Sequence, residues 1–343
     1  MFNHLILSAV VLCAFAHSAP VNVCKTGNVI NKPVNNQPVY WPATWKENQS
    51  APHLENGQSC SWIVTVPEGF YAKVIISGKV NDTQSFFQSI DSAGNVIKTT
   101  HENKEPYYFP STKFTIIVSN QGPATFAFKI QWAPFPSKID SSMKVGKNPQ
   151  LVNITEEIFA AEYSSMTGIS LLAFPSDLKK ISTLRSSLVF EGKDFNGAYI
   201  SNLYLLYKSK KQWISAGNSV YIVNLEAREV SDQLLIQESS YTKDIQEYVE
   251  FNCKINSTCL YKLESGKKGA VISTEYTTQT LWAVTLNVNE YLTVYYGSPN
   301  EEGRHFTISG ATIQSNLPLT FRSSVTQYVV SGETASFTFQ VSD

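Results

Sequence analysis

The chain has 343 residues, with 27 Lys and Arg against 28 Asp and Glu, so its formal net charge at neutral pH is −1. A balanced charge without a Lys- or Arg-rich run argues against nucleic acid and anionic membrane surfaces as partners. Charged residues make up only 16% of the chain, whereas Ser, Thr, Asn, Tyr and Phe are common, and this composition suits β-sheet with neutral polar faces. The length predicts two domains, or three small ones.

The N-terminal residues 1–18 are predicted to be a secretory signal peptide. The apolar run Leu5–Phe15 is too short to span a bilayer, and small residues follow it. Cleavage after Ser18 would place Ala16 at the −3 position. The alternative is a buried N-terminal strand or helix, since the first residues lack Lys and Arg. No later stretch has 18 consecutive apolar residues, so we expect a secreted, extracellular protein without a transmembrane segment.

Four cysteines remain after removal of the signal peptide, and an even number in an oxidising compartment predicts disulfide bonds. Of the three connectivities, we favour Cys24–Cys60 and Cys253–Cys259. In the chain-entropy picture, the first bond closes a loop of about 37 residues and stabilises by roughly 4 kcal/mol, and the second closes about 7 residues and adds roughly 2 kcal/mol. Two free thiols at the second pair are the alternative.

Four Asn-x-Ser/Thr sequons predict a glycoprotein. None has Pro in the middle position, so each is competent for N-glycosylation if exposed. They are centred on Asn48, Asn81, Asn153 and Asn256.

Short alternating segments at the spacing of all-β domains occupy the first third of the mature chain. In the clearest of them, Phe126, Phe128, Ile130 and Trp132 share one face. One apolar and one polar face per strand is typical of an antiparallel sandwich. The predicted strands are Ser61–Val66, Tyr71–Ser77, Phe86–Ile90, Val96–Thr100, Lys113–Ser119 and Thr125–Trp132.

Residues 136–150 are polar, contain Gly and Pro, and are predicted to be a linker. Residues 151–343 are again rich in strand patterns, which predict one sandwich, or two small ones that divide near residues 245–270. One short helix is predicted at Asp177–Leu184, where Leu178, Ile181 and Leu184 recur three apart. The main predicted strands are Gly168–Phe174, Ser187–Phe190, Tyr199–Tyr207, Ser219–Val223, Gln233–Ile236, Leu281–Val288, Tyr291–Tyr296, His305–Ile308, Leu319–Arg322 and Ser336–Val341.

Residues 20–135 resemble the CUB domain, and more closely the secreted CUB-like proteins of nematodes. The CUB pattern Cys-x-Trp-x-(Ile/Val)-x-x-Pro is filled by Cys60, Trp62, Val64 and Pro67, and the aromatic-Pro segment Tyr40–Trp45 stands upstream. Cys60 leads into an alternating strand that ends at Pro67 and Gly69, and a second strand begins at Tyr71, which predicts a disulfide-linked opening hairpin at residues 60–71. The resemblance implies an antiparallel jelly-roll-like sandwich. It also implies a binding role in secreted proteins of innate immunity and intestinal defence.

The chain departs from the CUB pattern in two respects. The CUB-like region lacks the second cysteine pair of a full CUB domain. Where many CUB domains supply acidic ligands to calcium, this sequence has Gln88 and Asn120. Because calcium requires several hard oxygen ligands, mostly carboxylates, we expect no metal site and no cofactor.

Nothing in the sequence predicts an enzyme. The mature chain keeps His53, His101 and His305 on separate segments, and it has no zinc-protease, nucleophile-elbow or phosphate-loop motif. The predicted partner is therefore an extracellular protein or glycan. Two other interpretations stay open, a structural component of an extracellular coat or matrix and a secreted hydrolase.

The candidate ligand-binding residues are aromatic side chains next to prolines in predicted loops, because aromatic faces stack on the apolar faces of sugar rings. The alternative is that these rings fill the core of the sandwich and seal its ends. The set consists of Tyr40, Trp41, Trp45, Tyr107 and Tyr108.

Overall fold

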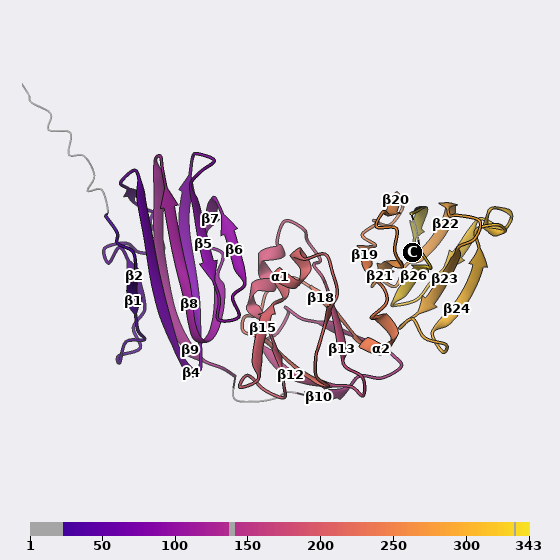
Figure 1. Ribbon diagram of the computed structural model, residues 1–343, viewed down its shortest axis with the longest axis horizontal. Coiled ribbons are helices and arrows are strands. Elements are labelled where there is room, and N and C mark those ends of the chain that lie inside the picture. The colour runs from indigo at the N-terminus through magenta and orange to yellow at the C-terminus, as the bar shows by residue number, and fades with distance from the viewer. Residues whose placement is uncertain (1–22, 137–140, 333) are drawn as a thin grey trace, which may run out of the picture.

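The structure, a computed structural model, describes residues 23–136, 141–332 and 334–343, so the predicted signal peptide lies outside it. Strands dominate, and they form three units that lie side by side in chain order (Figure 1). The first unit, residues 23–136, is a nine-stranded sheet. The second, residues 141–242, and the third, residues 247–342, each combine a five-stranded with a four-stranded sheet. The predicted all-β class is confirmed.

The first unit is built around three long strands, β4, β8 and β9, in the order β2-β9-β4-β8-β5-β6. Their inward side chains form an apolar core that contains Trp62, Phe114, Phe126 and Phe128. The strands are β1 (Asn28–Ile30), β2 (Val39–Trp41), β3 (His53–Leu54), β4 (Gln58–Val80), β5 (Phe86–Ile90), β6 (Val96–Thr99), β7 (His101–Asn103), β8 (Tyr107–Asn120) and β9 (Ala124–Pro134).

The opening hairpin predicted at residues 60–71 is absent, because β4 runs without reversal through the predicted turn. Its partner strand β8 stays antiparallel on both sides, pairing Val66 with Thr112 and Tyr71 with Pro110. The register shifts between Val66 and Tyr71, and Gly69 there has a φ of 78°. Pro and Gly suit an irregular strand as well as a turn, so the same residues make a bulge that bends the strand.

The second and third units have the same topology. Their five-stranded sheets run β10-β12-β17-β14-β15 and β19-β21-β26-β23-β24, and their four-stranded sheets run β11-β18-β13-β16 and β20-β27-β22-β25. Each strand of the third unit thus has the same position in its sheet as the strand of the second unit whose number is lower by nine. Strand β21, for example, corresponds to β12. In each unit the first strand pairs in parallel, β10 with β12 and β19 with β21, whereas the other pairs are antiparallel.

The second unit contains nine strands and most of the helical residues. Its first strand lies inside the segment predicted as a linker. The elements are β10 (Ser141–Lys144), β11 (Gln150–Asn153), β12 (Phe159–Ser164), β13 (Ile169–Phe174), a 3-10 helix η1 (Ile181–Ser186), β14 (Ser187–Glu191), β15 (Ala198–Asn202), α1 (Leu203–Lys208), β16 (Trp213–Ile214), β17 (Ser219–Asn224), β18 (Gln233–Glu238) and α2 (Ser239–Thr242).

The third unit repeats the nine strands with one short 3-10 helix. The elements are β19 (Glu247–Glu250), β20 (Thr258–Leu263), β21 (Gly269–Ser273), β22 (Thr278–Thr285), β23 (Tyr291–Tyr296), β24 (Arg304–Ser309), η2 (Ile313–Asn316), β25 (Leu319–Phe321), β26 (Thr326–Val330) and β27 (Ala335–Ser342).

Two secondary-structure predictions need correction. The strand predicted at Tyr199–Tyr207 ends at Asn202, whose side chain accepts a hydrogen bond from the Leu205 amide at 3.0 Å and so caps helix α1. The helix predicted at Asp177–Leu184 is the 3-10 helix η1, displaced toward the C-terminus.

The sheets of neighbouring units pack face to face. The outer face of β12, β14 and β17 packs on the first unit through Phe190, Tyr221 and Val223, which meet Tyr108 and Phe135. The outer face of β21 and β26 packs on β13 and β18 of the second unit in the same way. The central strands of the five-stranded sheets, such as β17 in the second unit and β21 and β26 in the third, are therefore buried on both faces. The last four-stranded sheet has an uncovered outer face.

Candidate functional site

Three of the five aromatic residues predicted to bind a ligand are buried. Trp45 is 3% exposed, and Tyr107 and Tyr108 are each 2% exposed. Tyr107 and Tyr108 begin strand β8 instead of lying in a loop, and they pair with Val74 and Lys73 of β4. The predicted exposed platform at this position is therefore wrong, because the second unit covers these rings.

Tyr40 and Trp41 keep part of their surface accessible. Trp41 packs against Trp62 with ring centroids 4.9 Å apart, and thus seals one end of the core. The Lys46 ammonium lies 4.3 Å from the centroid of the Tyr40 ring and occupies one of its faces. Ligand binding through these two residues stays a prediction.

Tyr107 instead belongs to a buried polar cluster between the first and second units. Its hydroxyl donates to Glu102 Oε1 at 2.5 Å, and Arg185 Nη1 lies 3.6 Å from Glu102 Oε2. The Arg185 guanidinium is held between the rings of Tyr107 and Tyr204, at 3.9 and 4.9 Å from their centroids. Burial raises the pKa of Glu102, although Arg185 and Tyr107 counteract it. The cluster joins the two units and offers no open site.

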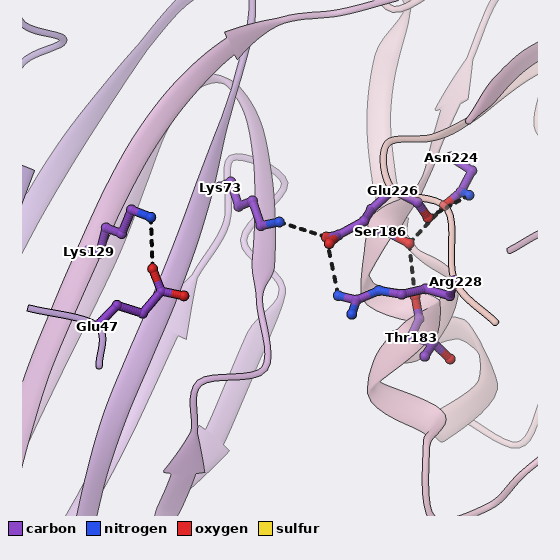
Figure 2. A network of polar contacts seen from close by, with 8 residues as sticks. All are labelled: Glu47, Lys73, Lys129, Thr183, Ser186, Asn224, Glu226 and Arg228. Carbon is purple, nitrogen blue, oxygen red and sulfur yellow. Dashed lines mark hydrogen bonds and ion pairs between the residues drawn. The ribbon is translucent and has the colours of Figure 1, made fainter. Parts of the chain in front are cut away.

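A second, more exposed network crosses the same boundary (Figure 2). Lys73 of β4 donates to Glu226 Oε2 at 2.8 Å, and Arg228 lies 3.2 Å from the same oxygen. Beside it, the Asn224 side chain donates to the Glu226 carbonyl at 2.9 Å and accepts from Ser186 at 2.7 Å. These contacts fix the loop after β17 against the first unit.

The outer face of the sheet β20-β27-β22-β25 is the surface with the most distinctive chemistry. Along β22, Gln279, Leu281 and Val284 point into the core, whereas Trp282 is 51% exposed. The neighbouring outward positions are mostly small and hydroxyl-bearing. We call this surface the threonine face and define it by Thr258, Leu260, Lys262, Thr278, Thr280, Trp282, Thr320, Arg322, Ser336, Thr338 and Gln340.

Trp282 owes its position to a bulge in β22. Leu281 pairs with Phe339 and Ala283 pairs with Thr338, so Trp282 between them is the extra residue. A bulge re-aims a side chain in this way. The indole Nε1 donates to Gln340 Oε1 at 2.8 Å, which holds the ring against the sheet while leaving half of it in solvent.

Further polar groups lie on the same face of the sheet as this ring. The hydroxyls of Thr280 and Thr320 lie 3.2 Å apart on adjacent strands. At the end of β22, the Arg322 guanidinium lies 4.7 Å from the centroid of the Tyr276 ring, which is 65% exposed. The threonine face thus combines exposed aromatic surface with hydroxyl, amide and guanidinium donors.

The equivalent sheet of the second unit shows that the threonine face differs from the faces that join units. Outward side chains of β13 and β18, such as Leu172 and Leu235, are apolar and pack under the third unit. At the corresponding strands β22 and β27, Thr280 and Gln340 stand outward instead. The topology is repeated, but the apolar packing surface is not.

Sequence reasoning missed Trp282. The predicted strand Leu281–Val288 covered this residue but assigned its side chain no role. The available signal was the run Leu281-Trp282-Ala283-Val284, which violates alternation. A bulge is one cause of such a break.

The structure contains two disulfide bonds. Cys24 is bonded to Cys60 and Cys253 to Cys259, with Cα atoms 5.6 and 5.8 Å apart. Both predicted pairings are therefore present. The side chains of all four sequon asparagines, Asn48, Asn81, Asn153 and Asn256, are exposed, so glycan attachment is sterically open at each. Occupancy stays a prediction.

Among the residues that the structure describes, no group of three or more His, Cys, Asp or Glu side chains could hold a metal ion. No helix there is both long enough and apolar enough to cross a bilayer.

Comparison with protein families places a CUB-like domain at residues 19–136. Residues 145–225 and 240–342 match two families that are each described as a domain of unknown function, DUF7592 and DUF7591. No curated protein sequence matches the chain. The CUB-like fold expected for the first unit is thus supported, whereas the likeness to nematode secreted proteins stays a prediction.

Similar solved structures include two fragments with CUB domains and one extracellular region. The CUB1-EGF-CUB2 domain of human MASP-1/3 is 8% identical, with 59% of this chain and 98% of that chain covered and a TM-score of 0.23. The CUB1-EGF-CUB2 domains of rat MASP-1 are 7% identical, with 61% of this chain and 99% of that chain covered and a TM-score of 0.23. The full extracellular region of zebrafish Gpr126/Adgrg6 is 9% identical, with 92% and 52% covered and a TM-score of 0.25. Scores this low carry no argument about function.

Proposed function

We propose that this chain is a secreted, glycosylated recognition protein that acts in defence against microbes by binding extracellular glycans. The CUB-like family match, the two disulfides and the four exposed sequons support an extracellular binding module. The defence role is implied by the resemblance of residues 20–135 to secreted CUB-like proteins. Binding is favoured over catalysis because the polar clusters around Glu102 and Glu226 connect neighbouring units and form no open site.

The threonine face is the observation that carries glycan binding. A sugar ring presents an apolar face of C–H groups and a rim of hydroxyls. The half-exposed indole of Trp282 can stack on that apolar face. Thr280, Thr320 and Gln340 supply donors and acceptors beside the ring, which is the complement that sugar hydroxyls require. The uncovered face of the sheet leaves room for an extended oligosaccharide.

A glycan array tests the proposal directly. The secreted chain is expected to bind a subset of microbial glycans, and Trp282→Ala should lose roughly 80% or more of that signal, since aromatic stacking contributes on the order of 1 kcal/mol or more per ring. Tyr291→Ala is the matched control, because Tyr291 is 53% exposed in the same unit but lies on the other sheet. Equal loss in both variants, or none in either, would refute the assigned surface.

A further inference from the structure

A crevice of about 280 Å³ lies between the second and third units. Strand β13 and helix α1 of the second unit form one wall, and β19 and β21 of the third unit form the other. The walls are largely apolar and include Leu172, Phe174, Val249 and Ile272. Small-molecule sites are typically apolar hollows of this kind at domain boundaries, with a few polar groups.

Contacts across the boundary keep the two walls in place. Leu172, Phe174 and Ile272 also belong to the apolar cluster that packs the second unit on the third. Just beyond helix α1, the Gln212 side chain donates to the carbonyls of Thr242 and Ile245 at 2.8 and 3.0 Å, which holds the segment that leads into the third unit against the second. The crevice is therefore part of the packed structure and needs no rearrangement to form.

The charges at this crevice are predominantly positive. Lys208, Lys210 and Lys211 line it with exposed side chains, and none of them takes part in an ion pair with the described residues. One acid, Glu250, lies in the opposite wall and accepts a hydrogen bond from Tyr207 at 3.5 Å. Burial raises the pKa of Glu250 to about 7, so its negative charge is partly lost at neutral pH. The three lysines thus outweigh it.

We propose that this crevice binds a single-chain amphiphile with an anionic head group, of the class of medium-chain fatty acids. The chain lies against the apolar walls, and the carboxylate pairs with the lysine cluster at the mouth. The volume of 280 Å³ equals about nine waters at ~30 Å³ each. A methylene group has a similar volume, so the crevice has room for an alkyl tail of about nine carbons with the carboxylate at the mouth. This site shares no residue with the threonine face, so either proposal can fail without the other.

Isothermal titration calorimetry of the full secreted chain tests the proposal with three probes below their micelle concentrations: decanoate, decanol and decyltrimethylammonium. Decanoate should bind once per chain and more tightly than decanol, and the cation should not bind. A triple variant should bind decanoate about tenfold more weakly and decanol with unchanged affinity, because three exposed ion pairs to the carboxylate are lost. It combines Lys208→Gln, Lys210→Gln and Lys211→Gln. The matched control replaces Lys25, Lys79 and Lys113, which are exposed in the first unit.

A blocking variant tests the location. Leu172→Trp should abolish decanoate and decanol binding by filling the crevice, and an unchanged unfolding midpoint shows that the chain still folds. If that variant fails to fold, the lysine variant, which changes only exposed side chains, decides the outcome alone. The proposal is overturned by absent decanoate binding at millimolar concentration, by equal loss in the control triple, or by tighter binding of the cation.

Discussion

The guanidinium carbon of Arg185 lies 3.9 Å from the centroid of the Tyr107 ring, across the boundary between the second unit and the first. Arg185 is 7% exposed and also faces the buried carboxylate of Glu102. A ring that was expected to stack on sugars therefore stacks on a cation of the same chain. The boundary is therefore a packed interface and not a flexible linker. It is formed by this cluster around Arg185, the network around Glu226 and the apolar cluster around Phe190.

Loss of the Arg185 charge is expected to destabilise this boundary strongly. In Arg185→Met the carboxylate of Glu102 stays buried without its cation, and breaking a buried pair in this way costs about 3 kcal/mol. Lys73→Met is the control, because Lys73 and Glu226 remain about 30% exposed and such pairs contribute about 1 kcal/mol or less. Denaturant unfolding measures both, and a cost for Lys73→Met as large as that for Arg185→Met would contradict this account.

The predictability of the fold depended on whether a strand had a face in water. Ser336–Val341 alternates between polar and apolar residues and Tyr291–Tyr296 does so along most of its length, and the predicted strands lie within β27 and match β23. Strands β21 and β26 were missed because both of their faces are buried, with all five residues of each below 9% exposure. Alternation disappears when both faces are packed.

The candidate site was harder to predict than the fold, because burial by a distant segment leaves no local signal. Tyr107 and Tyr108 are covered by residues some 80 or more positions downstream, such as Arg185 and Tyr221. The exposure of Trp282 likewise depends on a bulge and on the absence of a sheet above it. By contrast, cysteine spacing and sequons are local patterns, and the disulfide pairs followed from them.

The buried amide pair between the second and third units gives a second prediction. Gln327 Nε2 donates to Gln237 Oε1 at 2.7 Å, and both side chains are at most 1% exposed. Gln327→Leu should cost about 1–3 kcal/mol, because it leaves the Gln237 oxygen buried without a donor. Replacing both residues by Leu should recover part of that loss, because the Gly297 carbonyl, which accepts from Gln327 Nε2 at 2.7 Å, still loses its donor. Denaturant unfolding of the two single variants and the double variant checks this, and a double variant with additive losses would rule it out.

The two disulfides should differ in their contribution to stability. Cys24–Cys60 has a sequence separation of 36 residues and Cys253–Cys259 a separation of 6. In the chain-entropy picture, the longer loop loses more freedom in the unfolded state, so paired Cys→Ala variants should cost roughly 4 and roughly 2 kcal/mol, respectively. Thermal and denaturant unfolding of the two variants under oxidising conditions measures the order. A larger loss for the short loop would exclude loop closure as the main cause.

Two glutamates on the same short strand are expected to give opposite pH dependences. Burial raises the pKa of Glu250 to about 7, with a further increase from Glu275 and a decrease from the Tyr207 hydrogen bond. The folded state then holds a proton that the unfolded state has lost, so stability falls as pH rises from about 4 to about 7. Glu250→Gln should remove that fall, which amounts to at most ~3 kcal/mol for a shift of this size.

Glu247 is the matched control on β19. Burial opposes its ionisation, but the backbone amides of Glu264 and Ser265 donate to its carboxylate and lower its pKa overall. Its contribution to stability is therefore present above the unfolded pKa of about 4 and is lost as pH falls. Glu247→Gln should thus lower the free energy of unfolding at pH 7, whereas Glu250→Gln should raise it at the same pH. Unfolding free energies of both variants from pH 4 to pH 8 decide the matter, and changes of the same sign at pH 7 would show that burial does not control the pKa of Glu250.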